Sequence, residues 1–289
     1  MPARITLLIL FSAIAFRMQA ANIFVAPGGN DHNRGTLAKP FATLRRAQME
    51  ARKNRQVKVT VWRRGGTDYL KAPVIFTAAD SRTPNAPLLF KAWHNEHVII
   101  SGAIRLKLKW TPYKDGILQS QVESLPDGSP VFDELFVNGK LQNMARYPNY
   151  DAGARHYHGT AADALSPARI ASWQHPEGGY IHALHKSEWG DMSYRITGKD
   201  SRGGLTIEGG WQNNRPSAMH ARYRFVENIF EELDTVNEWY FDKLRHTLYD
   251  YPPEKINLAA ARIETPQLET LFEFNGDTAQ PVAYIGIEG

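Results

Sequence analysis

The sequence contains no cysteine among its 289 residues. Disulfide bonds, thiolate metal sites and a cysteine nucleophile are therefore excluded. The N-terminal apolar stretch, Ile5 to Phe16, is about a dozen residues long, whereas a helix that crosses a bilayer needs about 20 apolar residues. A large excess of basic residues is also missing, because the formal net charge is only +4. Without a Lys/Arg stripe or a binding motif, this balance argues against a nucleic-acid partner.

The N-terminus has the pattern of a secretory signal peptide over residues 1–21. Arg4 precedes the apolar stretch, and small residues follow it. We therefore expect a secreted or periplasmic protein with no membrane span after cleavage. An uncleaved anchor is the alternative, because Arg17 and Met18 fit the exit region poorly. Cleavage would remove Arg4 and Arg17 and lower the net charge from +4 to +2.

Short β-strand patterns dominate residues 57–102. Runs of β-branched, aliphatic and aromatic residues alternate with Gly, Pro, Asn or Asp, and strand starts recur about every 10 to 12 residues. This rhythm fits a sandwich, a barrel or a right-handed parallel β-helix. One amphipathic helix is predicted before it, from Leu44 to Lys53 with Thr43 as its N-cap, and would serve as a lid over the first coil. The same rhythm returns at residues 261–289.

The middle of the chain has a different pattern, typical of an inserted antiparallel β-sandwich over residues 104–260. Asn138-Gly139 between apolar strands predicts a type I′ hairpin turn. A short helix is expected from Pro167 to Trp173. Phe225 to Leu233 is either a helical turn or an irregular loop, and we favour the loop. The predicted organisation is therefore a signal peptide (1–21), a cap with the first β-helix coils (22–103), the insert (104–260) and resumed coils (261–289). The fold class is all-β.

Candidate catalytic groups are acidic clusters, because glycoside hydrolysis uses two carboxyl groups that face one sugar. Sequence spacing does not reveal such a pair. We interpret each cluster as structural, with Glu231/Glu232 expected beside Arg222 and Arg224, and leave the catalytic residues unassigned. The clusters are Asp133/Glu134, Glu231/Glu232 with Asp234, and Glu238/Asp242.

Candidate sugar-binding residues lie in two places. Trp211 follows Gly209-Gly210 and precedes a run of amides and a guanidinium, groups that recognise hydroxyls and carboxylates. A polar contact between insert and β-helix is the alternative role for this segment. Arg146 could bind an acidic sugar, or could pair with Asp133 or Glu134. The residues predicted to bind substrate are Trp211, Gln212, Asn213, Asn214, Arg215, Arg146 and Tyr147.

Metal sites have weaker support. Asn30 and Asp31 within a Gly-rich loop could ligate calcium, but Asx turns explain the same residues. His156 with His158, and His182 with His185, have spacings that could serve zinc, yet no third ligand of clear identity is near. We expect no metal and no cofactor.

Several motifs follow one another along the mature chain. They are Phe24-Val25-Ala26-Pro27-Gly28-Gly29-Asn30-Asp31, Val61-Trp62-Arg63-Arg64-Gly65-Gly66-Thr67, Leu135-Phe136-Val137-Asn138-Gly139-Lys140, Ala145-Arg146-Tyr147-Pro148-Asn149, Glu208-Gly209-Gly210-Trp211-Gln212-Asn213-Asn214-Arg215 and Glu238-Trp239-Tyr240-Phe241-Asp242. In this order they resemble the secreted right-handed parallel β-helix proteins grouped with family 141 glycoside hydrolases. The resemblance implies an N-terminal capping helix, first coils, a β-sandwich insert and resumed coils.

The resemblance also implies a function. Members of the family hydrolyse glycosidic bonds in complex polysaccharides. Their catalytic acidic residues lie on further coils, which would begin about where this chain ends at Gly289. We therefore expect the N-terminal portion of a hydrolase, truncated before its catalytic coils. Val236-Asn237 stands where the family commonly has Pro-Gly, so that loop is expected to differ.

Two other functions fit the same residues. One is a non-catalytic carbohydrate-binding or vestigial β-helix protein. The other is a polysaccharide lyase, which needs a base to remove a proton beside a uronate carboxylate. In all three cases the expected partner is a polysaccharide or oligosaccharide.

Overall fold

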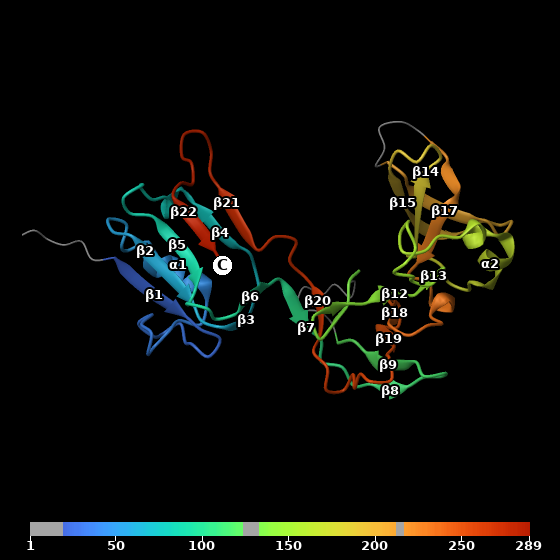
Figure 1. The fold of residues 1–289 in the computed structure, drawn as a ribbon, viewed down its shortest axis with the longest axis horizontal. Coiled ribbons are helices and arrows are strands. Elements are labelled where there is room, and N and C mark those ends of the chain that lie inside the picture. The colour runs from blue at the N-terminus through green and yellow to red at the C-terminus, as the bar shows by residue number, and fades with distance from the viewer. Residues whose placement is uncertain (1–19, 124–132, 212–216) are drawn as a thin grey trace, which may run out of the picture. The chain divides into compact units, whose positions relative to one another are not determined.

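The computed structural model describes residues 20–123, 133–211 and 217–289 (Figure 1). Strands outnumber helices among them, so the protein is all-β as predicted. The chain divides into two compact units. Unit 1 comprises the residues up to Gly102 together with Leu268–Gly289, and unit 2 is Ala103–Gln267. Nothing in the described helices is long and apolar enough to cross a membrane.

Unit 1 is built from short strands that all pair in parallel. They form a four-stranded sheet in the order β1-β2-β5-β22 and two pairs, β21-β4 and β3-β6. The strands are β1 (Ala21–Val25), β2 (Val59–Arg63), β3 (Gly66–Tyr69), β4 (Val74–Thr77), β5 (Leu88–Ala92), β6 (Val98–Ser101), β21 (Phe272–Asn275) and β22 (Ile285–Glu288). The short strands expected across residues 57–102 are confirmed. Whether the three parallel sheets make a β-helix stays a prediction.

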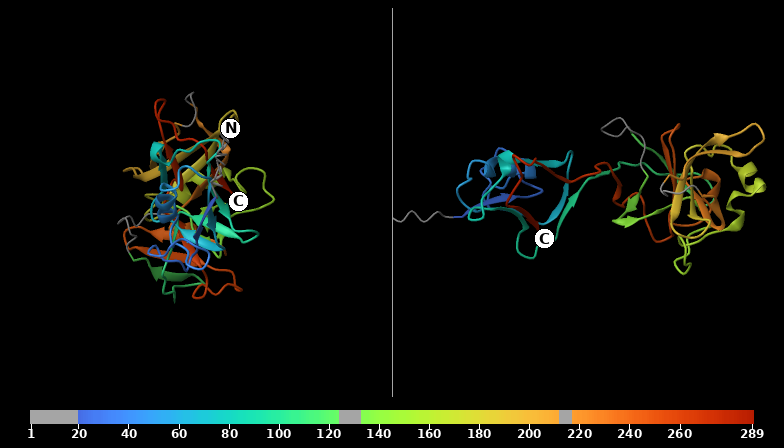
Figure 2. Two further views of the ribbon diagram at one scale, coloured as in Figure 1. Left: turned by 90° about the vertical axis from the view of Figure 1, so that its left-hand side faces the viewer. Right: turned by 90° about the horizontal axis from the view of Figure 1, so that it is seen from above.

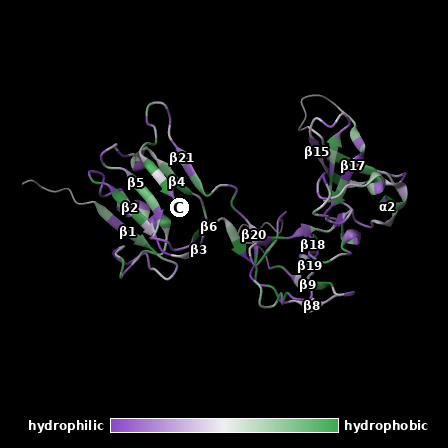
Figure 3. Cartoon of the chain, viewed as in Figure 1, coloured by the Kyte–Doolittle hydropathy of each residue, from purple (hydrophilic) through white to green (hydrophobic). Residues whose placement is uncertain are grey.

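The core of unit 1 consists of the apolar residues of these strands. Val25, Val59, Val61, Phe76 and Leu88 are completely buried. Figure 3 shows apolar residues along β2 and β5 and more polar colours in the connecting loops, and Figure 2 presents the same strands from two further sides. Removal of this surface from water stabilises unit 1 by about 25 cal/mol for each Å² of apolar area.

One helix, α1 (Leu44–Ala51), packs on this core and is two residues shorter than predicted. The Thr43 hydroxyl accepts a hydrogen bond from the Arg46 amide at 3.1 Å, which confirms the predicted N-cap. Leu44, Ala47 and Ala51 are buried, as the periodicity predicted. A 3₁₀ turn, η1 (Ala78–Asp80), follows β4.

In its described residues, unit 2 contains three sheets, and all strand pairs except β12-β18 are antiparallel. The sheet orders are β11-β10-β20-β7, β12-β18-β19-β9-β8 and β13-β17-β14-β15-β16. The strands are β7 (Ala103–Arg105), β8 (Thr111–Pro112), β9 (Leu118–Gln121), β10 (Phe136–Val137), β11 (Lys140–Leu141), β12 (Asn143–Met144), β13 (Arg146–Tyr147), β14 (Tyr180–His185), β15 (Asp191–Lys199), β16 (Leu205–Gly209), β17 (Met219–Glu227), β18 (Glu238–Asp242), β19 (Thr247–Tyr251) and β20 (Ile263–Pro266). The helical segments are η2 (Ala162–Leu165), α2 (Pro167–Ser172) and η3 (Phe230–Glu232). The sandwich arrangement of these sheets stays a prediction.

The β10-β11 hairpin has the predicted turn. Asn138 and Gly139 have φ angles of 52° and 79°, the left-handed values that a type I′ turn requires. The short helix predicted at Pro167 is also present as α2, and the Ser166 hydroxyl accepts a hydrogen bond from the Arg169 amide at its start.

Two expectations for unit 2 were wrong. Residues 225–227 are not an irregular loop but the end of β17, because Val226 pairs with Ile181 and is completely buried. Glu232 does not lie beside Arg222 and Arg224; it binds Arg169. In addition, β20 pairs with β7 and β10, so residues 263–266 belong to the sheets of unit 2.

Candidate functional site

One end of the sheet β13-β17-β14-β15-β16 presents two tryptophans to solvent. Trp189 is 68% exposed and Trp211 is 74% exposed. Trp189 lies in the turn between β14 and β15, and Trp211 lies directly beyond β16. The Gly210 amide donates a hydrogen bond to the Ser193 carbonyl oxygen at 2.9 Å, which brings the end of β16 to the beginning of β15. Trp189 and Trp211 therefore lie at the same end of the sheet, and we call this the tryptophan end.

Two glycines shape the chain before Trp211. Gly210 has a φ of +77°, and a Cβ atom on it would lie 2.5 Å from the Tyr194 ring. A Cβ atom on Gly209, where φ is +127°, would lie 2.5 Å from the Ser193 carbonyl oxygen. Only glycine fits both the backbone conformation and the close approach to β15. This pair of glycines turns the chain so that Trp211 is exposed.

Ring stacking and a hydrogen bond in the turn hold Trp189 in place. The rings of Trp189 and His185 stack with their centroids 5.5 Å apart and their planes at 2°. The His185 Nδ1 atom accepts a hydrogen bond from the Ser187 amide, which fixes the turn. Nearby, the His220 ring stacks on Tyr223 at 4.4 Å. An exposed indole face that is fixed in place suits the apolar face of a sugar ring. It offers a large rigid area, and few side-chain torsions have to become ordered on binding.

The remainder of the predicted segment after Trp211 lies outside the described residues. These residues are Gln212, Asn213, Asn214 and Arg215.

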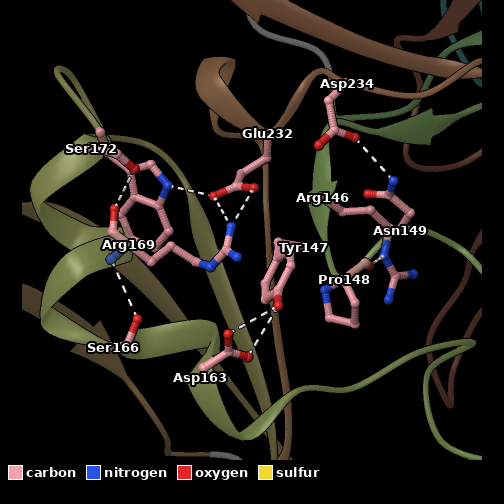
Figure 4. Close-up of polar contacts among 11 residues, drawn as sticks. Arg146, Tyr147, Pro148, Asn149, Asp163, Ser166, Arg169, Ser172, Glu232 and Asp234 are labelled. Carbon is pink, nitrogen blue, oxygen red and sulfur yellow. Dashed lines mark hydrogen bonds and ion pairs between the residues drawn. The ribbon is translucent and has the colours of Figure 1, made fainter.

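Arg146, another predicted binding residue, is buried within unit 2 (Figure 4). Its guanidinium donates hydrogen bonds to the carbonyl oxygens of Pro148, Tyr157 and Gly159 at 2.9, 3.0 and 3.0 Å. It also lies 4.2 Å from the centre of the Phe225 ring, and burial lowers its pKa. Arg146 is 5% exposed. It therefore holds the loop after β13 in place, and it pairs with neither of the acidic residues suggested as partners.

Tyr147 belongs to a polar network that Figure 4 shows. Its hydroxyl donates to the Asp163 carboxylate, with both oxygens at 3.1 Å, and the Arg169 guanidinium lies 3.1 Å from the centre of its ring. Arg169 Nη1 donates to both oxygens of Glu232 at 2.9 Å, and the Trp173 indole donates to Glu232 at 2.6 Å. These contacts connect β13, η2, α2 and η3. The network attaches the helical segment to the sheet.

Two carboxyl groups in unit 2 have strongly raised pKa values. Burial raises the pKa of Glu238 to about 8 and that of Asp250 to about 7. Their residues are only 1% and 3% exposed. Asp250 pairs across the sheet with Trp239, so it lies on the opposite face from Glu238. These two groups cannot face one sugar ring as a catalytic pair, and we assign no catalytic residue among the described positions.

Side chains of Ser193, His182 and Glu227 are connected across the neighbouring strands β15, β14 and β17 of the sheet that carries the tryptophan end. His182 Nδ1 lies 3.1 Å from the Ser193 hydroxyl, and Nε2 lies 2.8 Å from the Glu227 carboxylate. The imidazole ring stacks on Phe225 at 4.7 Å. Because Ser193 lies within the hydrogen-bonded ladder of β15 and β14, its backbone is committed to the sheet and offers no oxyanion hole. We interpret these contacts as a cross-strand connection.

The histidine and Asx motifs have local roles in the described residues. Asn30 accepts a hydrogen bond from the His32 amide two residues on, which is an Asx turn. Asp31 instead accepts hydrogen bonds from the distant Ala42 and Thr43 amides, just before α1. The His156 ring packs against Tyr223, and the His158 ring packs against Tyr150. Within the described ranges, no group of three or more His, Cys, Asp or Glu residues could hold a metal ion.

Trp189 is not among the residues predicted to bind substrate, although the sequence contains a signal for its exposure. Ser187-Glu188-Trp189-Gly190 lies between two runs of alternating apolar residues. Such a composition predicts a hairpin turn, and a tryptophan at a turn has little sheet surface to cover it. Its exposure follows from that position.

The fold thus defines an all-β protein in which an antiparallel unit interrupts a unit of short parallel strands. A comparison with protein-family models finds no match. A solved structure described as a glycoside hydrolase superimposes with a TM-score of 0.75 at 24% sequence identity, and the match covers 92% of this chain and 49% of that one. The two proteins share this fold.

Two curated proteins are similar over shorter stretches. The uncharacterized protein YwoF of Bacillus subtilis is 36% identical over 80 residues, which is 28% of this chain and 15% of that protein. Pectate lyase PEL9 of Emericella nidulans is 32% identical over 93 residues, which is 32% of this chain and 21% of that protein. The chain therefore matches about a fifth or less of the length of these relatives, and about half of the solved structure.

Proposed function

We propose that this chain is a secreted or periplasmic carbohydrate-active protein that belongs to a glycoside hydrolase acting on complex polysaccharide, with unit 2 as its polysaccharide-binding part. The fold shared with a solved glycoside hydrolase and the local similarity to a pectate lyase support the carbohydrate class. The all-parallel pairing in unit 1 supports a right-handed β-helix, with unit 2 as the insert.

The observation that carries the binding role is the tryptophan end. Large aromatic rings normally contribute to a core, yet Trp189 and Trp211 are both about two-thirds or more exposed at one end of one sheet. If a sugar covers about 100 Å² of each ring, burial contributes roughly 2.5 kcal/mol for each tryptophan before the costs of association. The two contacts together contribute about 5 kcal/mol before those costs.

The experiment is affinity electrophoresis through gels that contain soluble polysaccharides. The unmodified protein should be retarded by at least one of them, and Trp189→Ala or Trp211→Ala should weaken the retardation by about tenfold or more. Tyr284→Ala is the matched control, because it removes a 52% exposed aromatic side chain from unit 1. Circular dichroism checks that each variant is folded. Equal retardation of all variants would remove the tryptophan end from the proposal.

A non-catalytic binding protein is a second candidate. The two carboxyl groups with raised pKa values in unit 2 are almost completely buried, whereas the tryptophans are exposed. Retention on a polysaccharide without release of sugar would favour this candidate over the hydrolase.

A polysaccharide lyase is a third candidate, favoured by the 93-residue similarity to a protein named pectate lyase. Elimination leaves an unsaturated sugar that absorbs ultraviolet light, whereas hydrolysis releases a reducing end without it. Measuring both signals on one digest separates the two reactions.

A further inference from the structure

Unit 2 contains an open hollow of about 560 Å³ that is separate from the tryptophan end. Its volume lies within the range of roughly 300 to 1,000 Å³ that is usual for small-ligand sites. The residues come from four parts of the sequence: the segment before β14, the strand β15, the residue after β17, and β18 with the turn that follows it. They include His175, Glu177, Arg195, Asn228, Tyr240 and Lys243.

Hydrogen bonds hold two walls of this hollow in place. The Asn228 side chain is 7% exposed and donates to the Gly178 carbonyl oxygen at 2.9 Å. In the β18-β19 segment, Asp242 accepts hydrogen bonds from the amides of Leu244 and Arg245 at 3.0 and 2.8 Å. The walls are therefore formed before any ligand arrives, which lowers the entropic cost of binding.

The charges that line the hollow favour an anion. Arg245 pairs with Asp242 at 2.8 Å, so these two charges compensate each other. Arg195 and Lys243 also line the hollow, and neither forms an ion pair with another residue that the structure describes. The remaining lining carboxylate is Glu177. The hollow therefore carries more positive than negative charge.

We propose that this hollow binds a carboxylate-bearing sugar unit, a uronate, within a polysaccharide chain. This proposal rests on the function proposed above and specifies the class of ligand. The Arg195 guanidinium supplies the planar pair of N–H donors that fits a carboxylate, and Lys243 supplies a second positive charge. The Tyr240 ring and the Asn228 backbone offer apolar and polar contacts for the sugar ring and its hydroxyls. A neutral sugar would leave the two cations without a partner.

The test compares polygalacturonate with its fully methyl-esterified form, which has the same backbone without the negative charges. The unmodified protein should bind the acidic polymer at least tenfold more tightly in affinity gels, and added salt should weaken that binding. Arg195→Gln and Lys243→Gln should each reduce the preference for the acidic polymer by about threefold or more. Arg222→Gln is the matched control, because Arg222 is exposed on β17 of the same sheet but does not line the hollow.

The outcomes separate the two proposals. Equal binding of both polymers, or an unchanged preference in both Gln variants, would overturn the uronate proposal and leave the carbohydrate-binding function standing. Failure to bind either polymer or any neutral polysaccharide would overturn both. Lys243→Gln lies in a surface turn, so it still decides the question if Arg195→Gln does not fold.

Discussion

Glu238 should make the stability of unit 2 depend on pH in an unusual direction. Its carboxyl is 1% exposed, and burial together with the nearby Asp234 carboxylate raises its pKa from 4.5 to about 8. Backbone amides of Asp234, Thr235 and Arg146 face the carboxyl and offset part of the rise. Neither oxygen receives a hydrogen bond of normal geometry from the described residues. The folded protein therefore keeps this proton at neutral pH.

The sign of the effect follows from the two protonation states. Between about pH 4.5 and about pH 8 the unfolded chain releases the proton while the folded chain holds it, so the free energy of unfolding falls as the pH rises. At about 1.4 kcal/mol for each pH unit, this window amounts to about 5 kcal/mol, which is an upper value for one group. Asp250, with a pKa raised by burial from 3.8 to about 7, adds an effect of the same sign. Such a loss is a large fraction of a typical folding free energy.

Glu238→Gln should remove the Glu238 contribution. Urea unfolding followed by tryptophan fluorescence at about pH 5 and about pH 8.5 measures the difference. We expect the variant to lose less stability between the two pH values than the unmodified protein, by several kcal/mol. Glu254→Gln is the control, because Glu254 is exposed. If Glu238→Gln loses as much stability with rising pH as the control, Glu238 does not hold its proton in the folded state and the argument is refuted.

Three further substitutions test other parts of the structure. Glu232→Gln removes a buried charge from the network in Figure 4 and should lower the free energy of unfolding by about 2 to 4 kcal/mol in urea melts. A loss under about 0.5 kcal/mol would show that the network contributes little to stability. Gly210→Ala places a methyl group against the Tyr194 ring and should destabilise the protein by more than about 1 kcal/mol and weaken polysaccharide retention; unchanged retention would disconnect the glycine from Trp211. Thr43→Ala removes the N-cap of α1 and should lower the thermal stability of unit 1 by about 1 kcal/mol, whereas Thr43→Ser should restore most of it.

Local chemistry explains which elements could be predicted from sequence. The Asn138-Gly139 turn depends on two adjacent residues that accept positive φ angles, and both have them. The start of α1 depends on Thr43 and the amide three residues later. Signals of this kind lie within a few residues, so they can be recognised without knowledge of tertiary contacts.

Features that depend on distant contacts could not be predicted in this way. Residues 225–227 lack a clear alternating pattern because Phe225 and Val226 are both buried at the end of β17, which lies between β13 and β14 in its sheet. Glu232 is 63 residues from its partner Arg169, so nearby arginines in the sequence were misleading. The raised pKa of Glu238 depends on burial within the assembled sheets, and no local motif reports that.

The candidate site shows the same division. Gly209-Gly210 before Trp211 is a local signal for a sharply turned chain, and Trp211 is indeed exposed. Arg146 has a sequence context that suits sugar binding equally well, yet three carbonyl oxygens of the loop after β13 enclose it. The sequence around an arginine does not indicate whether its guanidinium is exposed to solvent or forms hydrogen bonds with backbone carbonyl groups.

The exposed aromatic rings and the buried protonated carboxyl groups are different residues, so sugar binding and proton donation can be tested separately. A general acid for glycosidic cleavage needs a raised pKa and also contact with the leaving oxygen. Glu238 meets the first condition, but at 1% exposure it does not meet the second in this conformation. Trp211 meets the requirement for sugar contact and has no proton to give. Glu238→Gln should therefore leave polysaccharide retention at about pH 5 unchanged while it alters stability at high pH, and Trp211→Ala should do the reverse. A Glu238→Gln variant that is folded but no longer retained would show that sugar reaches this carboxyl, and would make Glu238 a candidate for catalysis.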